Sequence, residues 1–363
     1  MYDVLVIGAG PAGSNVSYQL SRKGFRVKMV DLKERVGIPN HCSGLVDKRV
    51  VDVVGEDLVI DRPSVAEIST PIGSFSLNSR RMRVIDRVAL DQKLAAMAQS
   101  EGTDLSLMTM LTDVHEQGNL IHATVKSKRG FETIETKFIV GADGPASSVR
   151  RKISIRSPKL LRSLQFDLSR RSERVVINLD RKRTPDFFSW EIPSGKEVEV
   201  GASGINSEEV VKSMVGNYPV VRRRGGLIPI GPTQLGKGNA FLIGDAAGLS
   251  KSTTGGGLFA AIKSGDALST AIEKGGNVLQ EYQRNWYNSF GTEVRRDYKI
   301  RKLLDRYEKY YHLWVPLVSS NISGINKIGD VDYPSKTLLY MLYSLPLHFP
   351  LALMEFVSKS ISS

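Results

Sequence analysis

The sequence predicts an α/β fold in which a Rossmann-like parallel unit is interrupted by antiparallel β-sheet and followed by helices. Residues 1–31 are the first reason, because they have the pattern of a strand, a glycine-rich turn, a helix and a second strand. Two later motifs of glycine and acid, at 141–144 and 244–248, each end a predicted buried strand. Between these motifs, residues 160–235 are mostly predicted strands. The parallel unit is therefore expected to be discontinuous.

The turn after the first strand carries a Gly-x-Gly-x-x-Gly pattern. Its glycines are Gly8, Gly10 and Gly13, and the second predicted strand, 25–30, ends on Asp31. Glycines let the backbone approach a pyrophosphate at a helix N-terminus, where unpaired N–H groups favour anions. A carboxylate about 20 residues further on accepts a hydrogen bond from a ribose hydroxyl. This context predicts a bound adenine dinucleotide and leaves FAD, NAD and NADP open.

The remaining elements are expected in the following order. We predict helices at 46–54, 88–99, 208–218 and 257–272, and helical structure from 278 onward. We predict strands at 105–111, 114–116, 120–126, 132–140, 175–179, 187–192, 197–202 and 239–243, with short antiparallel strands within 60–77. The predicted domains are a discontinuous nucleotide unit at 1–62, 84–150 and 236–275, a β-rich unit at 63–83 and 151–235, and a C-terminal helical region at 276–363.

Cysteine, histidine and charge content narrow the possible functions. Cys42 is the only cysteine among 363 residues, which excludes internal disulfides and Cys-x-x-Cys metal sites and fits a reducing compartment. The five histidines have no metal-ligand spacing, so no metal is predicted. The net charge of +12 favours contact with phosphates of lipid headgroups or nucleic acid or with an acidic protein, unless it is only a solvated basic surface. The basic clusters are 80–83, 150–152, 181–183, 222–224 and 295–296.

Taken together, the three glycine motifs resemble FAD proteins of the p-hydroxybenzoate hydroxylase type. Only the first has the dinucleotide fingerprint, so no second nucleotide fold is available for a tightly bound NAD(P). The resemblance implies that Asp245 binds the ribityl chain and that the next helix points its N-terminus at the pyrimidine end of the flavin, where it favours negative charge. The implied cofactor contacts are Gly8, Gly10, Ala12, Gly13, Asp31, Cys42, Ser43, Gly44, Leu45, Arg87, Leu111, Asp143, Asp245, Gly256, Gly257 and Leu258.

Four further features resemble the geranylgeranyl reductase family, whose members saturate isoprenoid chains of archaeal membrane lipids or of chlorophyll precursors. They are a cysteine loop at 39–44, an aromatic-x-Trp-x-Ile-Pro string at 188–193 followed by residues 201–203, the flavin signature at 244–257, and a helix at 282–293. The sequence departs from the family at Asp31, Ile192, Ser203 and Ser252, and it is short for the family. The Trp string is also similar to one in flavin-dependent halogenases.

The resemblance implies hydride transfer from reduced FAD to one carbon of an isolated alkene and protonation of the other, in a dry site. The implied substrate residues are Phe188, Trp190, Ile192, Pro193 and Gly201. Cys42 is the candidate catalytic residue, either for proton delivery or only for packing, and His41 is a weaker candidate.

Three alternatives to this reductase stay open. The first is a flavin monooxygenase or halogenase, and the second is an electron-transfer flavoprotein, which could not hold an iron–sulfur cluster with one cysteine. The third is a non-enzymatic FAD-binding protein. For the reductase we expect an isoprenoid lipid substrate, an electron donor that is reduced ferredoxin, NAD(P)H or another carrier, and no nucleic acid partner.

The last apolar stretch bears on location. Residues 338–357 are nearly all apolar but are interrupted by Pro346, His348, Pro350 and Glu355, which is too broken for a membrane-spanning helix. Helices that close a lipid tunnel, an interfacial segment or a plain core helix pair are the alternatives. We expect a cytoplasmic protein in peripheral contact with the inner face of the membrane.

Overall fold

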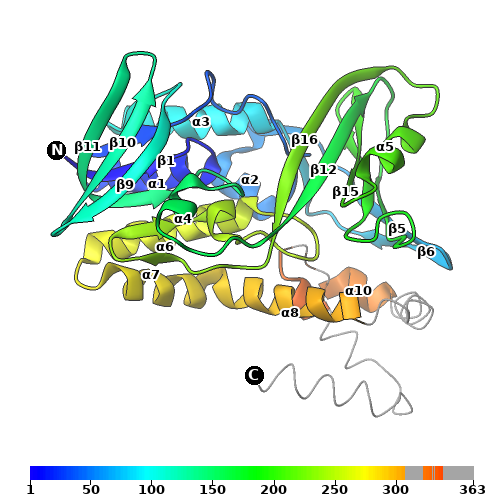
Figure 1. The fold of residues 1–363 in the computed structure, drawn as a ribbon. Coiled ribbons are helices and arrows are strands. Elements are labelled where there is room, and N and C mark those ends of the chain that lie inside the picture. Colours follow the sequence, from blue (N-terminus) through cyan, green and yellow to red (C-terminus); the bar gives the residue numbers. More distant parts are fainter. Residues whose placement is uncertain (307–321, 329, 331, 338–363) are drawn as a thin grey trace, which may run out of the picture.

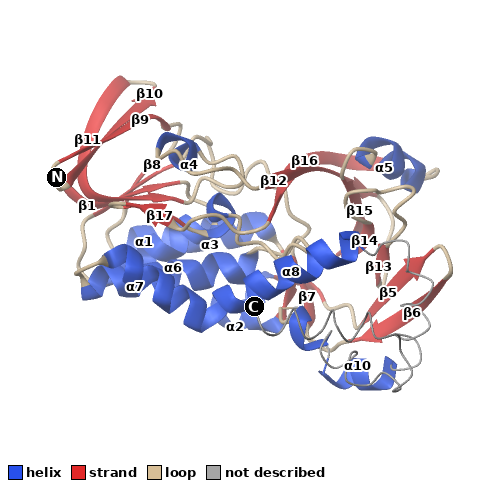
Figure 2. Ribbon diagram, turned by 60° about the horizontal axis from the view of Figure 1, so that its bottom comes forward, coloured by secondary structure: helices blue, strands red, loops and turns tan. Residues whose placement is uncertain are grey.

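The computed structural model describes residues 1–306, 322–328, 330 and 332–337. Two β-sheets lie beside each other, and helices pack along one side of them (Figures 1 and 2). The mixed α/β architecture predicted from the sequence is confirmed. The predicted segment 338–357 lies outside the described residues.

An eight-stranded sheet contains the N-terminal strand. Its members are β1 (Tyr2–Ile7), β2 (Val27–Val30), β8 (Asp104–Ser106), β9 (Met110–Gln117), β10 (Leu120–Ser127), β11 (Gly130–Gly141), β17 (Gly236–Lys237) and β18 (Ala240–Leu242). The order β18-β11-β1-β2-β8 is parallel throughout, and β9 and β10 continue from β11 as an antiparallel meander. The last four residues of β1 are all buried, as expected for a parallel strand covered on both faces.

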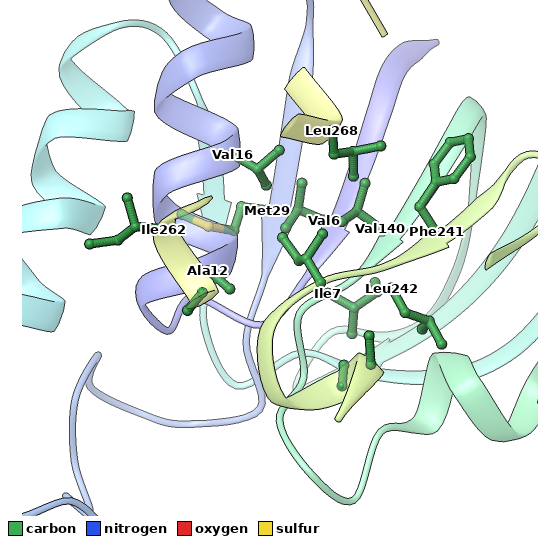
Figure 3. Close-up of a cluster of buried hydrophobic side chains, with 14 of the residues drawn as sticks. Val6, Ile7, Ala12, Val16, Met29, Val140, Phe241, Leu242, Ile262 and Leu268 are labelled. Carbon is green, nitrogen blue, oxygen red and sulfur yellow. The ribbon is translucent and has the colours of Figure 1, made fainter. Parts of the chain in front are cut away.

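Helices cover the nucleotide sheet. They are α1 (Pro11–Arg22), α3 (Arg87–Ser100), α6 (Leu258–Lys274) and α7 (Val278–Trp286). α1 packs against both α3 and α6, and α7 packs against α6. Figure 3 shows the resulting core, where Val16 of α1 and Leu268 of α6 meet Val6 and Val140 of the central strands. Burial of these apolar side chains is the main stabilising contribution here.

A seven-stranded sheet forms the second unit, in the order β16-β12-β15-β14-β13-β5-β6. Its strands are β5 (Val65–Thr70), β6 (Gly73–Asn78), β12 (Lys159–Leu168), β13 (Val175–Asn178), β14 (Ser189–Ser194), β15 (Glu197–Ser203) and β16 (Val220–Ile230). All neighbours are antiparallel except β13 and β5. Helix α5 (Ser207–Val215) covers one face, where its Val210 and Val211 pack on Val198 and Val200 of β15. Side chains alternate between the two faces along a strand, so the alternate residues of these strands form the other face of the sheet. That other face is turned toward the nucleotide unit.

Short elements join the two units. They are β3 (Leu45–Asp47), α2 (Lys48–Val54), η1 (Glu56–Leu58), β4 (Val59–Asp61), β7 (Met82–Ile85), α4 (Ser148–Lys152) and η2 (Gly244–Ala247). β3, β7 and β4 form a three-stranded sheet. Met82 and Val84 of β7 pack against Trp190 and Ile192 of β14, so this small sheet closes against the larger one.

The C-terminal helices form a rod along both units (Figure 1). After α7 come a π-helical turn, η3 (Tyr287–Gly291), then α8 (Thr292–Arg306) and α10 (Ile322–Ile328). Asp297 of α8 accepts hydrogen bonds from Ser252 and Thr253, and Arg301 donates to the carbonyls of Ser252 and Asp186. α8 is thereby fixed to both the nucleotide unit and the seven-stranded sheet. Within the ranges that the structure describes, no helix is long and apolar enough to cross a membrane.

The structure corrects one predicted strand and reinterprets the basic clusters. Residues 105–111 are not one strand, because Met108 has a φ of 50° and its N–H bonds the Lys33 carbonyl, which turns the chain between β8 and β9. Arg150 is 1% exposed, and the side chain of Arg224 is 8% exposed. These two arginines therefore belong to the interior rather than to a basic surface. The predicted domain boundaries stay a prediction.

Candidate active site

The glycine-rich turn joins β1 to α1. Gly8 has a φ of 105°, which L side chains rarely adopt. A Cβ on Gly13 would lie 1.9 Å from the Gly8 carbonyl oxygen, so the helix packs directly on the turn. A Cβ on Gly10, by contrast, would meet no atom of the described chain within 4 Å. Gly8 and Gly13 are therefore required by the packing of the protein, whereas Gly10 faces open space that a ligand can approach.

Helix α1 begins at this opening without a side-chain cap. Gly10 is its N-cap residue, and the first turn contains no acid. Unpaired N–H groups at a helix N-terminus attract phosphate groups. Asp31 lies on the other side of the turn, where its carboxylate accepts hydrogen bonds from the N–H of Ala9, at 2.7 Å, and of Lys33, at 2.8 Å. The arrangement fits the pyrophosphate and adenosine half of a dinucleotide.

The second motif packs against the first. A Cβ on Gly8 would lie 2.4 Å from the Ala142 carbonyl oxygen. Asp143 follows, and its Oδ2 accepts hydrogen bonds of 2.6 Å from both N–H and Oγ of Ser148, the first residue of α4. Its Oδ1 is buried and has no hydrogen-bond partner among the described residues. One oxygen of Asp143 thus fixes the turn, and the other can accept a donor from a ligand.

The third motif brings Asp245 to the start of α6. A Cβ on Gly257, the N-cap residue of α6, would lie 2.8 Å from Asp245 Oδ1, so only glycine allows this approach. No side chain caps the N-terminus of α6 in the described structure. Burial raises the pKa of Asp245 to about 6, and the nearby Arg87 guanidinium opposes that rise. The Asp245 carboxylate can accept hydrogen bonds from hydroxyl groups of a ligand. The uncapped start of α6 offers N–H donors to the polar edge of a ring.

Arg87 connects this motif with the cysteine loop. It donates to Asp91 at 2.8 Å. Burial lowers the pKa of Arg87, but the Asp91 carboxylate and the nearby Cys42 sulfur outweigh this effect and raise the pKa overall. Its Nε is buried and has no hydrogen-bond partner in the part of the chain that the structure describes. The free donor on Arg87, the free acceptor on Asp143 and the open helix starts of α1 and α6 fit FAD.

The cysteine loop is held by the seven-stranded sheet and by β7 of the small sheet. Asn40 Oδ1 accepts from the Cys42 N–H at 3.0 Å, and Arg224 of β16 donates to the Cys42 carbonyl at 3.2 Å. Gln165 of β12 donates to the His41 carbonyl at 3.0 Å. The Gly44 carbonyl then accepts from the Ile85 N–H, at 3.0 Å, which leads the chain into β3. Cys42 is partly exposed at the junction of the two units.

The seven-stranded sheet presents aromatic side chains beside this junction. Phe187 and Phe188 stack with ring centroids 4.1 Å apart, and Phe188 meets Trp190 edge-on at 5.8 Å. A Cβ on Gly255, in the loop before α6, would lie 3.5 Å from the Phe187 ring and 3.4 Å from Ile228. The aromatic row therefore runs from the loop at the start of α6 to the small sheet. Trp190 and Ile192 are 7% and 5% exposed, and Phe188 is half-buried.

The structure brings Cys42, Arg87 and Asp245 together at this junction. The predicted contacts Gly8, Gly10, Gly13, Asp31 and Asp143 lie around the first turn instead. Leu111 is buried in β9, within the core of the nucleotide unit. Pro193 follows Ile192 in β14, so its side chain lies on the opposite face of the strand. Sequence reasoning missed Gln165, Phe187, Glu199 and Arg224, which belong to the face of the seven-stranded sheet that meets the cysteine loop or to its aromatic row. The arginine cluster at 222–224 and the aromatic pair at 187–188 were visible, but register alone shows which members point inward.

The geometry is that of an FAD-binding site on a Rossmann-like fold. Residues 1–170 match the family described as FAD binding domain. The chain is 27% identical to digeranylgeranylglycerophospholipid reductase 2 of Methanothermobacter thermautotrophicus over an alignment of 376 residues. This alignment covers 92% of this chain and 97% of that protein. The predicted cofactor, FAD, and the resemblance to geranylgeranyl reductases are confirmed.

Two solved structures show how far the fold is shared. A geranylgeranyl bacteriochlorophyll reductase-like protein from Thermoplasma acidophilum superimposes with a TM-score of 0.83 at 19% identity, over 93% of this chain and 95% of that chain. The flavin-dependent halogenase CmlS has a TM-score of 0.66 at 16% identity, over 81% of this chain and 63% of that chain. At these identities both likenesses concern the fold alone.

Proposed function

We propose that the protein is an FAD-dependent oxidoreductase that saturates C=C bonds in the geranylgeranyl chains of membrane-lipid precursors. The observation that carries the proposal is the meeting of three parts at one junction. These are the Asp245 motif at the start of α6, the Cys42 loop, and the aromatic row of Phe187, Phe188 and Trp190. The reductase similarity over 92% of the chain supports the same reading.

FAD would be held by the turn at Gly10, by Asp31, Asp143 and Arg87, and by the start of α6. When bound and reduced, it would supply a hydride to one carbon of the alkene. The N-terminus of α6 favours negative charge at the adjacent end of the site. We assign to Cys42 the delivery of a proton to the other alkene carbon, because its thiol is the side chain of the loop that reaches the junction beside Arg87.

The isoprenoid would lie along the aromatic row. Apolar side chains exclude water, which matters because an isolated alkene accepts hydride poorly in a wet site. Phe188 is the half-buried member, so it offers the most surface to a ligand, whereas Trp190 and Ile192 are buried in a cluster with Met82, Val84 and Val175. Gly201 shapes the wall by leaving room for the Trp190 ring.

We also propose peripheral contact with an anionic lipid surface, with reduced ferredoxin or NAD(P)H as the candidate electron donors. The net charge of +12 supports the lipid contact. Flotation with vesicles tests it: the protein should float with anionic vesicles at low salt and remain behind with neutral ones.

One anaerobic experiment tests the reductase activity. The FAD-loaded protein is reduced with dithionite and mixed with geranylgeranyl lipid, while flavin absorbance and the mass of the lipid are followed. Reoxidation with a gain of two hydrogens per double bond is expected. If the lipid is unchanged under anaerobic conditions and is hydroxylated or halogenated only after air is admitted, the protein is a monooxygenase or halogenase instead. If the lipid is unchanged and the flavin is reoxidised only after quinone is added, the protein is an electron-transfer flavoprotein.

A further inference from the structure

One face of the seven-stranded sheet carries a line of residues in register. Arg224 of β16 lies opposite Gln165 of β12, which lies opposite Gly201 of β15, which lies opposite Trp190 of β14. The next row along the strands contains Asp167 and Glu199, which are also opposite each other. Because side chains alternate, both rows point to the face that meets the cysteine loop, while Phe166 and Val200 point to α5.

Arg224 is the centre of a buried ionic cluster on this face. Its guanidinium donates to Glu199 at 2.7 Å and also to Asp167, and all three side chains are at most 8% exposed. Arg222 approaches Asp167 to 3.4 Å from the solvent side. A buried ionic cluster adds little stability compared with well-packed apolar side chains, because desolvation offsets the attraction between the charges. The stability of the sheet therefore does not explain this choice of residues.

Both ends of the cluster reach the proposed site. At one end, Arg224 uses its other nitrogen to donate to the Cys42 carbonyl at 3.2 Å. At the other end, Glu199 accepts from Trp190 Nε1 at 2.8 Å. Gly201 has no side chain, and this leaves room for the Trp190 ring to reach Glu199. A Cβ on residue 201 would lie 2.4 Å from the ring. Gln165 adds a second link, from the same face to the His41 carbonyl at 3.0 Å.

We propose that Arg224 is a positioning residue that sets the Cys42 loop relative to Trp190. Glu199 and Asp167 hold the guanidinium in one orientation, and that orientation leaves one nitrogen aimed at the loop. Cys42, the proposed proton donor, and Trp190, part of the proposed substrate wall, are then both fixed to the seven-stranded sheet. The consequence for turnover rests on the proposed reductase activity, but the position of the loop does not.

The single cysteine makes a direct test possible, because alkylation by iodoacetamide reports on Cys42 alone. The rate is measured on the folded, FAD-loaded protein across about pH 6.5 to 9.5, so that the limiting rate reports accessibility and the midpoint reports thiol ionisation. Arg224→Met should raise the limiting rate about tenfold, because one hydrogen bond from a charged donor to the loop is lost. Arg224→Lys should fall between wild type and Arg224→Met, since it keeps the charge but not the planar fork.

Arg223→Met is the matched control, because Arg223 lies next in the same strand and stacks over Phe166 on the opposite face. It should label at the wild-type rate. Arg224→Lys decides the matter if Arg224→Met does not fold, since it keeps a positive charge beside Asp167 and Glu199 but loses the planar fork that reaches the Cys42 carbonyl. A folded Arg224→Met or Arg224→Lys that labels at the wild-type rate, or equal acceleration in Arg223→Met, would overturn the proposal. A wild-type protein that fails to reduce isoprenoid would overturn the proposed function and leave the labelling result standing.

Discussion

Lys251 Nζ lies 2.8 Å from Asp332 Oδ1, and both side chains are 5% exposed. Lys251 belongs to the loop that leads into α6, and a Cβ on Gly256 would come 3.3 Å from its Nζ. Asp332 belongs to the C-terminal segment, and its other oxygen lies 3.7 Å from Arg49 of α2. A buried ion pair therefore connects the C-terminal segment with the loop that leads into α6.

Removing Lys251 should be costly, because the buried Asp332 carboxylate loses its 2.8 Å partner and keeps only the longer, 3.7 Å approach of Arg49 as an ion pair within the described residues. We expect Lys251→Met to lower the free energy of unfolding by about 3–5 kcal/mol. Lys48→Met is the control, since Lys48 pairs with Asp52 on the surface of α2 and should cost no more than about 1 kcal/mol. Urea unfolding of the FAD-free protein measures both, and equal losses would contradict the prediction.

The raised pKa of Asp245 predicts a pH dependence of stability. Because the folded protein holds this proton up to about pH 6 and the unfolded chain only to about 3.8, the unfolding free energy falls as the pH rises between these values. The fall from this group is at most about 3 kcal/mol, the free-energy equivalent of that pKa difference. The Asp245→Asn variant should not show this fall in unfolding free energy, because the amide does not titrate. Urea unfolding of both FAD-free proteins at about pH 4, 5, 6 and 7 tests this, and a pH-independent difference between them would refute it.

The glycines of the first turn should separate ligand binding from folding. Gly10→Ala should leave the melting temperature of the FAD-free protein unchanged, because the added Cβ meets no described atom, but it should weaken FAD binding at least about tenfold by filling the pyrophosphate approach. Gly13→Ala should instead destabilise the FAD-free protein, since its Cβ would collide with the Gly8 carbonyl. Flavin fluorescence titration and thermal melts distinguish the two. Tight FAD binding by Gly10→Ala would show that the pyrophosphate lies elsewhere.

Gly201 should be intolerant of any side chain. Gly201→Ala places a Cβ about 2.4 Å from the Trp190 ring, so we expect a loss of about 1–3 kcal/mol and displacement of the indole from Glu199. Gly225→Ala in the same sheet is the control, because its nearest contact, the Ser163 carbonyl oxygen, is 3.5 Å away. Tryptophan fluorescence and urea unfolding report the two effects. Identical spectra for both variants would argue against the packing described.

Cys42→Ala tests the assigned proton delivery. FAD should remain bound, because the loop is held through backbone groups of His41 and Cys42, but flavin reoxidation by geranylgeranyl lipid should slow by about 10²-fold or more. Stopped-flow absorbance under anaerobic conditions measures the rate. Reoxidation at the wild-type rate would leave Cys42 a packing role only.

The nucleotide unit was predictable because its signals are local. The turn at Gly8 to Gly13 and the acid at Asp31 lie within one strand–helix–strand unit, so spacing along the chain is also spacing in the fold. The Asp245 motif was found in the same way. The strand expected at 105–111 was wrong because its break depends on hydrogen bonds of Met108 and Thr109 to the distant residues Lys33 and Asp31.

Sequence alone determined the fold class, the FAD motifs and the likeness to reductases of isoprenoid chains, since each rests on motifs whose own residues lie close together in the chain. Only the tertiary structure decided that Arg224 points inward while Arg223 does not, and that Arg224 meets both Glu199 and the Cys42 loop. Strand register decides such contacts, and this register depends on the pairing of β16 with β12, which sets Arg224 opposite Gln165, 59 residues earlier in the chain. The first thirty-one residues predict where the cofactor binds, and the register of the second sheet decides which side chains lie beside the Cys42 loop.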